Sequence, residues 1–315
     1  MAPTSSSSSP ALSTAPEPGE ATKPERLGPL AVFLTLLVVV GPFIGAVVAL
    51  TTLWGSHVGW FHVALLAGMY VITVLGLSAG YHRLFTHNSY VARRPLKIAL
   101  AVAGSFALEG SVTSWVGNHR VHHRCSDRSG DPHSPVVGAR SRMRGLLHAH
   151  MGWLFRPGPE VRRRDVADLL VDRDIVVVSK MFPLFAFLTF AVPFALGWLV
   201  THSWWGAIMG LVWGGLARVF LAHHVTWSVN SLCHVFGRRP FETGDRSANV
   251  APLALLSLGE AWHNAHHAFP TSARHGVERF QLDITARCIR VWEQLGWAHS
   301  ARWLRAEQLD RRRTG

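Results

Sequence analysis

Four long apolar runs constrain the fold of this chain more than any other feature. They cover residues 29–53, 58–80, 181–200 and 203–223 of the 315. Each run has the length of about 20 apolar residues that a helix needs to cross a bilayer. Short links join the first run to the second and the third to the fourth, so each pair predicts a helical hairpin. We therefore expect an all-α integral membrane protein with four transmembrane helices in two hairpins, capped by a cytoplasmic helical domain.

The distribution of basic residues predicts the orientation of these helices. The net charge is +12, yet the two short links contain no Lys or Arg. Basic residues flank the other ends of the runs, at Lys23, Arg26, Arg83, Arg93, Arg94, Lys180 and in the arginine-rich C-terminus. Because such residues stay on the cytoplasmic side of a membrane, both termini and the long middle segment are expected in the cytoplasm. A nucleic-acid partner is not expected, since no groove-reading motif is present.

Composition divides the chain into three parts. Residues 1–26 are rich in Ser, Pro, Ala and Thr, which predicts a disordered tail, and they lack the pattern of a signal peptide. Residues 27–280 form the main domain, and residues 281–315 are expected to hold an amphipathic helix and a basic tail. Residues 96–108 are apolar but too short to span, which predicts an interfacial or re-entrant helix, or a lid.

Three histidine-rich segments follow closely on apolar stretches, at residues 82–87, 119–123 and 263–267. The second and third share the pattern H-x-x-H-H, and residues three and four apart lie on one face of a helix. Imidazole binds iron, zinc, copper and nickel, and the predicted topology places all three segments on one side of the membrane. They contain more imidazoles than a four-coordinate zinc site uses, so a dinuclear metal centre is favoured.

These segments, in this order between two pairs of apolar runs, resemble the histidine boxes of the membrane fatty acid desaturase family. The resemblance is closest to the acyl-CoA delta-9 (stearoyl-CoA) desaturases and extends over about residues 30–280. Further matching stretches are residues 115–123, 130–133, 226–231 with His234, and 259–260.

The resemblance implies two iron ions (Fe²⁺/Fe³⁺), with O₂ as co-substrate and no catalytic residues beyond the metal ligands. Asn230 corresponds to a family asparagine that approaches one iron through water, and His234 is implied by the resemblance alone. Carried over by position, the nine ligands are His82, His87, His119, His122, His123, His234, His263, His266 and His267.

The implied reaction introduces a cis double bond at the delta-9 position of a long-chain acyl-CoA, of the stearoyl-CoA or palmitoyl-CoA type, in unsaturated fatty acid biosynthesis. One methylene contributes only about 0.8 kcal/mol of burial, so the position of the double bond requires a closed tunnel of fixed depth. Trp227 corresponds to a family tryptophan near the substrate, and Asn118 stands where animal relatives carry an aspartate.

Two further substrate candidates have less specific support. Arg156, with Arg140, Arg142 and Arg144, has the guanidinium chemistry that binds phosphate, although anionic lipid headgroups are an equal alternative. Tyr70, in the second apolar run, either limits the length of the acyl chain or packs against lipid and neighbouring helices.

The chain carries no recognisable haem, flavin, nicotinamide or iron–sulfur motif, so a separate ferredoxin- or reductase-type electron donor is expected. An acyl-lipid desaturase or a fatty acid hydroxylase of the same histidine-box superfamily is an alternative, which analysis of the products would distinguish. A metal-binding membrane transporter is the non-enzyme alternative. It is less favoured because the histidines cluster beyond the apolar runs and not within them.

Overall fold

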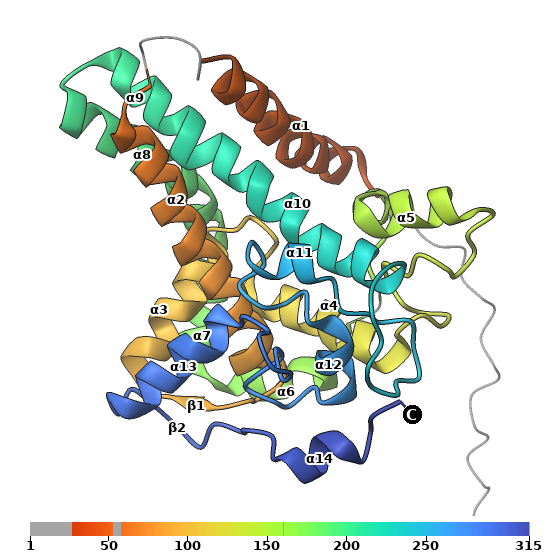
Figure 1. Cartoon of the computed structure of the whole chain (residues 1–315). Helices are drawn as coiled ribbons and strands as arrows, with labels where there is room; N and C mark the ends of the chain where they lie inside the picture. Colours follow the sequence, from red (N-terminus) through yellow and green to blue (C-terminus); the bar gives the residue numbers. More distant parts are fainter. Residues whose placement is uncertain (1–26, 53–57, 160, 315) are drawn as a thin grey trace, which may run out of the picture.

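The computed structural model describes residues 27–52, 58–159 and 161–314, and the predicted tail at 1–26 lies outside them. Four helices are long and apolar enough to cross a membrane: Pro29–Thr52, Trp60–Thr86, Phe182–Thr201 and Trp204–His234. The first is α1 and the third is α8 (Figure 1). The four predicted apolar runs therefore all form helices of membrane-spanning length.

The second and fourth of these helices continue well beyond the predicted ends at residues 80 and 223. Helix α2 (Trp60–Leu75) runs directly into the π-helix η1 (Gly76–Thr86). The fourth consists of α9 (Trp204–Gly210), η4 (Leu211–Ala217), α10 (Arg218–Ser231) and η5 (Leu232–His234). Hydropathy placed the ends too early because the added turns carry polar residues such as His82 and Arg83, which the protein itself buries.

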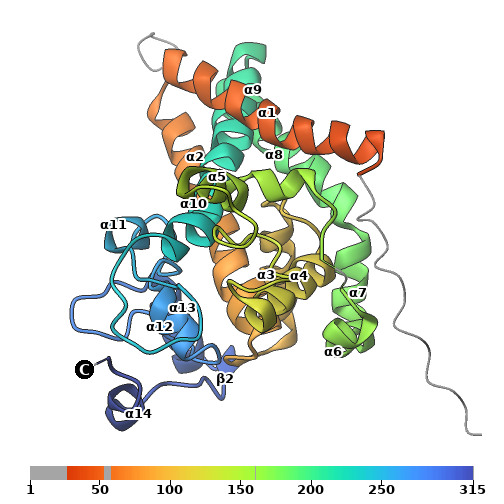
Figure 2. The same cartoon turned by 90° about the vertical axis from the view of Figure 1, so that its right-hand side faces the viewer.

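The shorter elements gather at one end of the long helices, away from α9 (Figure 1). In the perpendicular view, α6 and α7 lie on one side of this region and α12 to α14 on the other (Figure 2). The helices are α3 (Arg94–Ser105), α4 (Val112–Cys125), α5 (Arg142–His150), α6 (Ala167–Val171), α7 (Arg173–Lys180), α11 (Ala251–Ala254), α12 (His263–Ala268), α13 (Ile284–Gln294) and α14 (Ala306–Asp310), with 3-10 turns η2 (Gly152–Phe155) and η3 (Arg163–Val166). Strands β1 (Val91–Ala92) and β2 (Ala298–His299) pair antiparallel, with Val91 opposite His299.

Helix α3 is the short apolar helix expected near residues 96–108. It begins at Arg94 with Pro95 in its first turn, where the missing N–H of proline costs no hydrogen bond. Its buried residues Leu96 and Leu100 join the main core with residues of η1. No described residue of α3 itself lines the cavity beside the histidines, but Leu108, at the end of the predicted segment, does, so the choice between an interfacial helix, a re-entrant helix and a lid stays a prediction.

Small residues let η1 and α3 approach closely. A Cβ atom on Gly76 would lie 2.2 Å from the backbone nitrogen of Gly104, and one on Gly104 would lie 2.5 Å from the Tyr81 ring. The Tyr81 hydroxyl is 2.9 Å from Ser105 Oγ in the same contact. This packing fixes the helix that carries His82, the first histidine of the candidate metal centre.

We expect Gly76→Ala to destabilise the protein by about 1–3 kcal/mol, because the added methyl group forces α3 away from η1. Gly68→Ala is the matched control on the same helix, since nothing lies within 4 Å of a Cβ atom there. Thermal unfolding of both variants in detergent measures the effect. An unchanged melting temperature for Gly76→Ala would show that the helices do not meet as described.

Candidate metal centre

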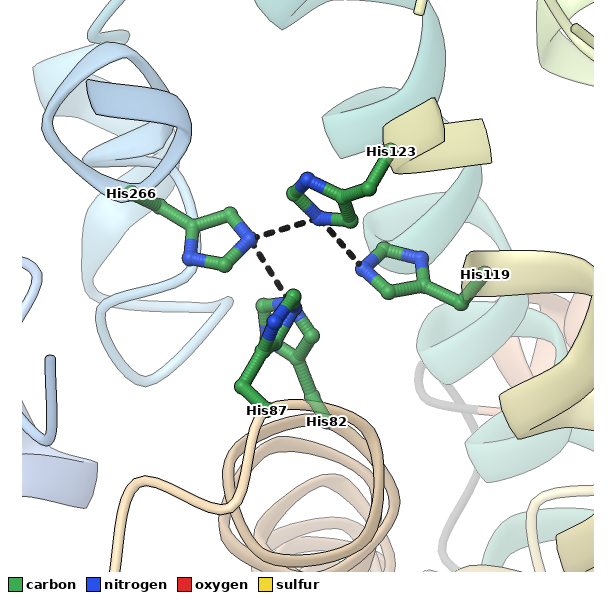
Figure 3. Close-up of side chains that lie close together, drawn as sticks. All are labelled: His82, His87, His119, His123 and His266. Atoms are coloured by element: carbon green, nitrogen blue, oxygen red, sulfur yellow. Dashed lines mark hydrogen bonds between the residues drawn. The ribbon is translucent and has the colours of Figure 1, made fainter. Parts of the chain in front are cut away.

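All nine histidines that the resemblance implies as ligands lie together, in two adjacent groups. The five-histidine group contains His82, His87, His119, His123 and His266 (Figure 3), and the four-histidine group contains His122, His234, His263 and His267. Within each group, the candidate ligand atoms lie within 4.8 Å of one another. The groups adjoin, with the rings of His123 and His267 stacked at a centroid distance of 4.6 Å.

Helical geometry divides each H-x-x-H-H segment between the two groups. On α4, His119 and His123 are four residues apart and enter the five-histidine group, whereas His122 enters the other. On α12, His263 and His267 enter the four-histidine group, whereas His266 enters the five-histidine group. The sequence predicted one shared direction for each segment, but a side chain at the intermediate position points to the neighbouring group.

The separations between facing nitrogens fit metal coordination. The Nε2 atom of His266 lies 3.0 Å from that of His82 and 2.9 Å from that of His123, which in turn lies 3.1 Å from that of His119. In the four-histidine group, the Nε2 atoms of His234 and His263 are 3.0 Å apart. For metal–nitrogen bonds of about 2.1 Å, two ligands at right angles are separated by about 3.0 Å.

Hydrogen bonds between the rings cannot account for all of these short Nε2–Nε2 distances. A neutral imidazole carries one proton, so an Nε2 atom that donates to one neighbour cannot also accept from another. The linked series His82, His266, His123 and His119 therefore cannot be hydrogen-bonded at all three contacts. A cation among the nitrogens satisfies all of them together, so the donor set fits metal ions.

Four carboxylates set the tautomer of histidines on the outer side of the centre. The Nδ1 atom of His122 donates to Asp131 at 2.9 Å, that of His234 to Asp127 at 2.9 Å, and that of His267 to Asp245 at 2.6 Å. His82 Nδ1 likewise contacts Glu260. With its proton on Nδ1, each ring presents the lone pair of Nε2 to the centre, as in other histidine-ligated metal sites.

The ionisation of these groups follows from burial and pairing. Burial alone would raise the pKa of Asp131, but the hydrogen bond and charge interaction with His122 hold it well below its usual value. The same balance, with His267 as partner, lowers the pKa of Asp245. Burial also holds the pKa of His119 and His266 well below the ordinary value, so the imidazoles stay neutral, the form that binds metals.

Glu260 belongs to a buried ionic network that anchors His82. Its carboxylate accepts from Arg83, whose side chain is 0% exposed and also lies 3.1 Å from Asp283. His275 is fully buried beside it, with Nδ1 3.5 Å from Glu260 and its ring 4.4 Å from that of His266. The sequence pattern did not single out His275, because it lies outside the three histidine-rich segments.

An apolar cavity of about 300 Å³ reaches both groups of histidines from the side of α1. His82 and His119 of the five-histidine group and His263 of the four-histidine group are among the residues that line it. Other residues that line it are Leu34, Val38 and Val39 of α1, Val74 of α2, Leu77 of η1, Trp115 and Asn118 of α4, Trp153 of η2, and Trp227 and Asn230 of α10. Of the predicted substrate residues, Trp227 and Asn118 thus lie on the cavity wall, as does Asn230.

The other two predicted substrate residues lie elsewhere. Arg156 lines a separate hollow of about 350 Å³, the basic hollow, together with Arg140, Arg144 and His148. Tyr70 is buried against Val74 and donates to the carbonyl of Leu256 at 2.7 Å. It is not among the described residues that line the cavity, so the structure gives no support to a role in limiting chain length, and Tyr70 packs between helices.

Glu109 is a carboxyl group on the cavity wall that the sequence pattern did not reveal. It accepts a hydrogen bond from Trp115 Nε1 at 2.9 Å. Burial raises its pKa to about 7, although the hydrogen bond from Trp115 works in the opposite direction. Around neutral pH the group therefore exchanges between a neutral acid and a charge inside an apolar cavity.

Comparison with known proteins identifies the class of protein that this fold and site define. Residues 58–303 match the family model described as fatty acid desaturase. Since the match covers more than half of the chain, the protein belongs to the fatty acid desaturase family.

Curated relatives agree on the family but differ in the carrier of the acyl chain. The chain is 35% identical to the Hex-5-enoyl-(acyl-carrier protein) acetylenase of Moorena producens, over 87% of each chain. It is 35% identical to the sn-1 stearoyl-lipid 9-desaturase of Anabaena variabilis, over 84% of this chain and 92% of the relative. It is 32% identical to a probable acyl-CoA desaturase of Schizosaccharomyces pombe, over 78% of this chain but 55% of the relative. Family membership therefore leaves the carrier open.

We expect the Glu109 carboxyl to make stability depend on pH. Because its pKa in the folded protein is about 7, above the ordinary 4.5, its contribution is complete below pH 4.5 and is lost as the pH rises to 7. Between pH 5 and pH 8 the wild type should lose about 2–3 kcal/mol relative to Glu109→Gln, which cannot ionise. Melting temperatures of both proteins across this range test the effect. If the melting temperatures of the wild type and Glu109→Gln changed equally with pH, Glu109 would not be a neutral acid in the folded protein at pH 5.

Proposed function

We propose that this protein is an O₂-dependent acyl-CoA delta-9 desaturase whose nine clustered histidines bind two iron ions. The observation that carries the proposal is that members of both histidine groups line one apolar cavity. The reaction removes one hydrogen from each of two adjacent methylenes and reduces O₂ to two waters. It consumes two electrons and two protons from outside the substrate.

The two histidine groups would each hold one iron. Asn230 supports this assignment, because it lines the cavity and stands four residues before His234, a member of the group with fewer histidines. There its amide would complete the coordination through a water molecule. When bound, the irons supply the oxygen chemistry that side chains cannot perform. The protein keeps a proton on Nδ1 of His122, His234 and His267 by having each donate to an outer carboxylate, so that the lone pair of Nε2 faces inward.

The chain's own residues position the acyl group and exclude water. The aliphatic side chains of α1 and α2 provide an apolar wall, and burial of each methylene there contributes about 0.8 kcal/mol. Trp227 and Asn118 both lie on the cavity wall, and Asn118 directly precedes the candidate ligand His119, so they would help to orient the acyl chain. The depth of the cavity, measured from a fixed headgroup, would select the delta-9 position.

The basic hollow favours coenzyme A as the carrier. Its three arginines suit the phosphates of the headgroup. It lies close in sequence to the cavity, because Trp153 and Leu154 line the cavity just before Arg156. An acyl-lipid substrate is the second candidate, supported by the similarity to the sn-1 stearoyl-lipid 9-desaturase. Positive residues at the ends of the spans support a topology with both termini and the metal centre in the cytoplasm.

Removal of a ligand should remove metal and activity together. We expect His266→Ala and His122→Ala, one from each histidine group, to lose at least half of the bound iron and nearly all turnover. His224→Ala is the control, because His224 lies outside both groups and contacts His150 at 2.9 Å. Metal analysis after anaerobic purification and product analysis with stearoyl-CoA measure the two effects. A His266→Ala protein with full iron content would contradict the ligand assignment.

Removal of charge from the basic hollow should affect acyl-CoA binding and not metal content. We expect Arg140→Ala/Arg156→Ala to raise the KM for stearoyl-CoA by at least about tenfold, since a hydrogen bond to a charged group contributes about 1.5–3 kcal/mol. Turnover of a stearoyl-lipid in vesicles, measured in parallel, separates the two candidate substrates. A wild type that converts only the lipid would replace acyl-CoA with acyl-lipid in the proposal.

A further inference from the structure

Glu109 places a carboxyl group on the wall of the apolar cavity with only one of its two oxygens in a hydrogen bond. Its Oε2 atom accepts from Trp115 Nε1 at 2.9 Å, whereas Oε1 is buried and has no hydrogen-bond partner among the described residues. The hydroxyl of Thr226 lies near this group but donates to the carbonyl of Ala222 at 3.0 Å. Because a buried charged oxygen without a donor is costly, the site favours the neutral acid.

The two carboxyl groups on the described cavity wall are stabilised in opposite ways. Glu260 forms an ion pair with Arg83, whose guanidinium lies 2.9 Å away. Glu109 forms no ion pair in the described part of the chain, and its one hydrogen-bond donor is the uncharged indole of Trp115. The cavity therefore contains one carboxylate that a cation balances and one carboxyl group that is left without a counter-charge.

The charged and titratable groups around Glu109 are engaged with other partners. Those that face it from neighbouring elements are Tyr81 on η1, His119 on α4, and Arg218 and His223 on α10, and His82, His133, Glu260 and His263 line the same cavity. Arg218 donates to the carbonyl of Phe106 at 2.8 Å, and His223 donates to that of Ala107 at 2.7 Å. Burial is thus the main cause of the raised pKa of Glu109, which is about 7.

An acyl chain in the cavity would deepen the burial of Glu109. The residue is partly exposed and lines the cavity, so methylenes packed there would remove solvent from around its carboxyl group. Methylenes supply no hydrogen-bond donor in return. Since loss of solvent disfavours the charged form of a carboxyl group, the neutral acid is the form compatible with a bound acyl chain.

We infer that Glu109 must be protonated for an acyl chain to occupy the cavity, so that substrate binding takes up one proton at this carboxyl group. The inference rests on the proposed function, which makes an acyl chain the occupant. The neutral side chain completes an apolar wall, whereas the charged one excludes methylenes. The proton is bound when the acyl chain enters and can be released when the product leaves, and no bond of the substrate changes in this step.

The size of the effect follows from the fraction of the protein that carries the neutral acid. With a pKa of about 7 in the free protein, about nine-tenths of the Glu109 side chains are neutral at pH 6 and about one-tenth at pH 8. When only the neutral form binds, the apparent Kd is the intrinsic Kd divided by this fraction. The Kd for an acyl substrate should therefore rise about tenfold from pH 6 to pH 8.

The primary test measures this Kd without turnover. The full-length, iron-loaded protein in nanodiscs is titrated with stearoyl-CoA in the absence of reductant at pH 6, 7 and 8. We expect the Kd of the wild type to rise about tenfold and that of Glu109→Gln, which still accepts from Trp115 but cannot ionise, to change less than about twofold. Glu242→Gln is the matched control, because it removes an exposed carboxyl group outside the cavity, and it should behave as the wild type.

A second measurement counts the protons. Calorimetric titrations at pH 8 in two buffers of different ionisation enthalpy should show about 0.9 more protons taken up per stearoyl-CoA by the wild type than by Glu109→Gln. An equal change of Kd with pH in the two proteins, or equal proton uptake, would overturn the inference. A wild type that binds stearoyl-CoA with the expected pH dependence but forms no desaturated product would instead overturn the proposed function.

Discussion

The hydrogen bond between an outer carboxylate and the Nδ1 atom of a histidine is the interaction on which the rest of the site depends. Nine imidazoles in contact would otherwise be free to turn lone pairs away from one another. Asp131, Asp127 and Asp245 each hold one ring in the tautomer that presents Nε2 inward. Facing nitrogens stand about 3 Å apart, a separation that suits two bonds to a shared cation. The fold thus arranges these residues in groups that could hold metal ions.

The carboxylates must themselves be stabilised, because isolated charges in a protein interior are costly. Glu260 is stabilised by an ion pair with Arg83, from which it accepts a hydrogen bond. Arg83 also forms an ion pair with Asp283, so the buried guanidinium balances two carboxylates. Arg83 lies next to His82 on η1, the continuation of a membrane-length helix. One helix therefore supplies a wall of the cavity, a histidine of the centre and the cation that balances the carboxylate behind that histidine.

The sequence predicts the parts of this structure that local patterns specify. The four apolar runs gave the number of membrane-length helices, and the resemblance in the three boxes, with His234, gave the nine residues that the structure brings together. Hydropathy ended two helices early, because it reads polar residues such as Arg83 on the second and His234 on the fourth as solvent-exposed, whereas both are buried. Asp127 and Asp245 were not found, since they lie 107 and 22 residues from the histidines they contact. Glu109 was missed for a similar reason, because only the folded cavity distinguishes its carboxyl from one in water.

The division of each H-x-x-H-H segment between two groups has a consequence for assembly. Helix α4 contributes to both groups, and so does α12. Neither histidine group is complete unless α4 and α12 are both in place. A shift of either helix therefore displaces members of both groups. Binding at one group therefore favours the helix arrangement that the other group needs, which is positive coupling through shared elements. The same arrangement leaves His82, His119 and His263 on the cavity, whereas His87, His123 and His267 line a separate hollow of about 270 Å³. Rings that surround a common point must face in several directions. The histidine groups are thus reached from two hollows because both groups are built from the same two helices, α4 and α12.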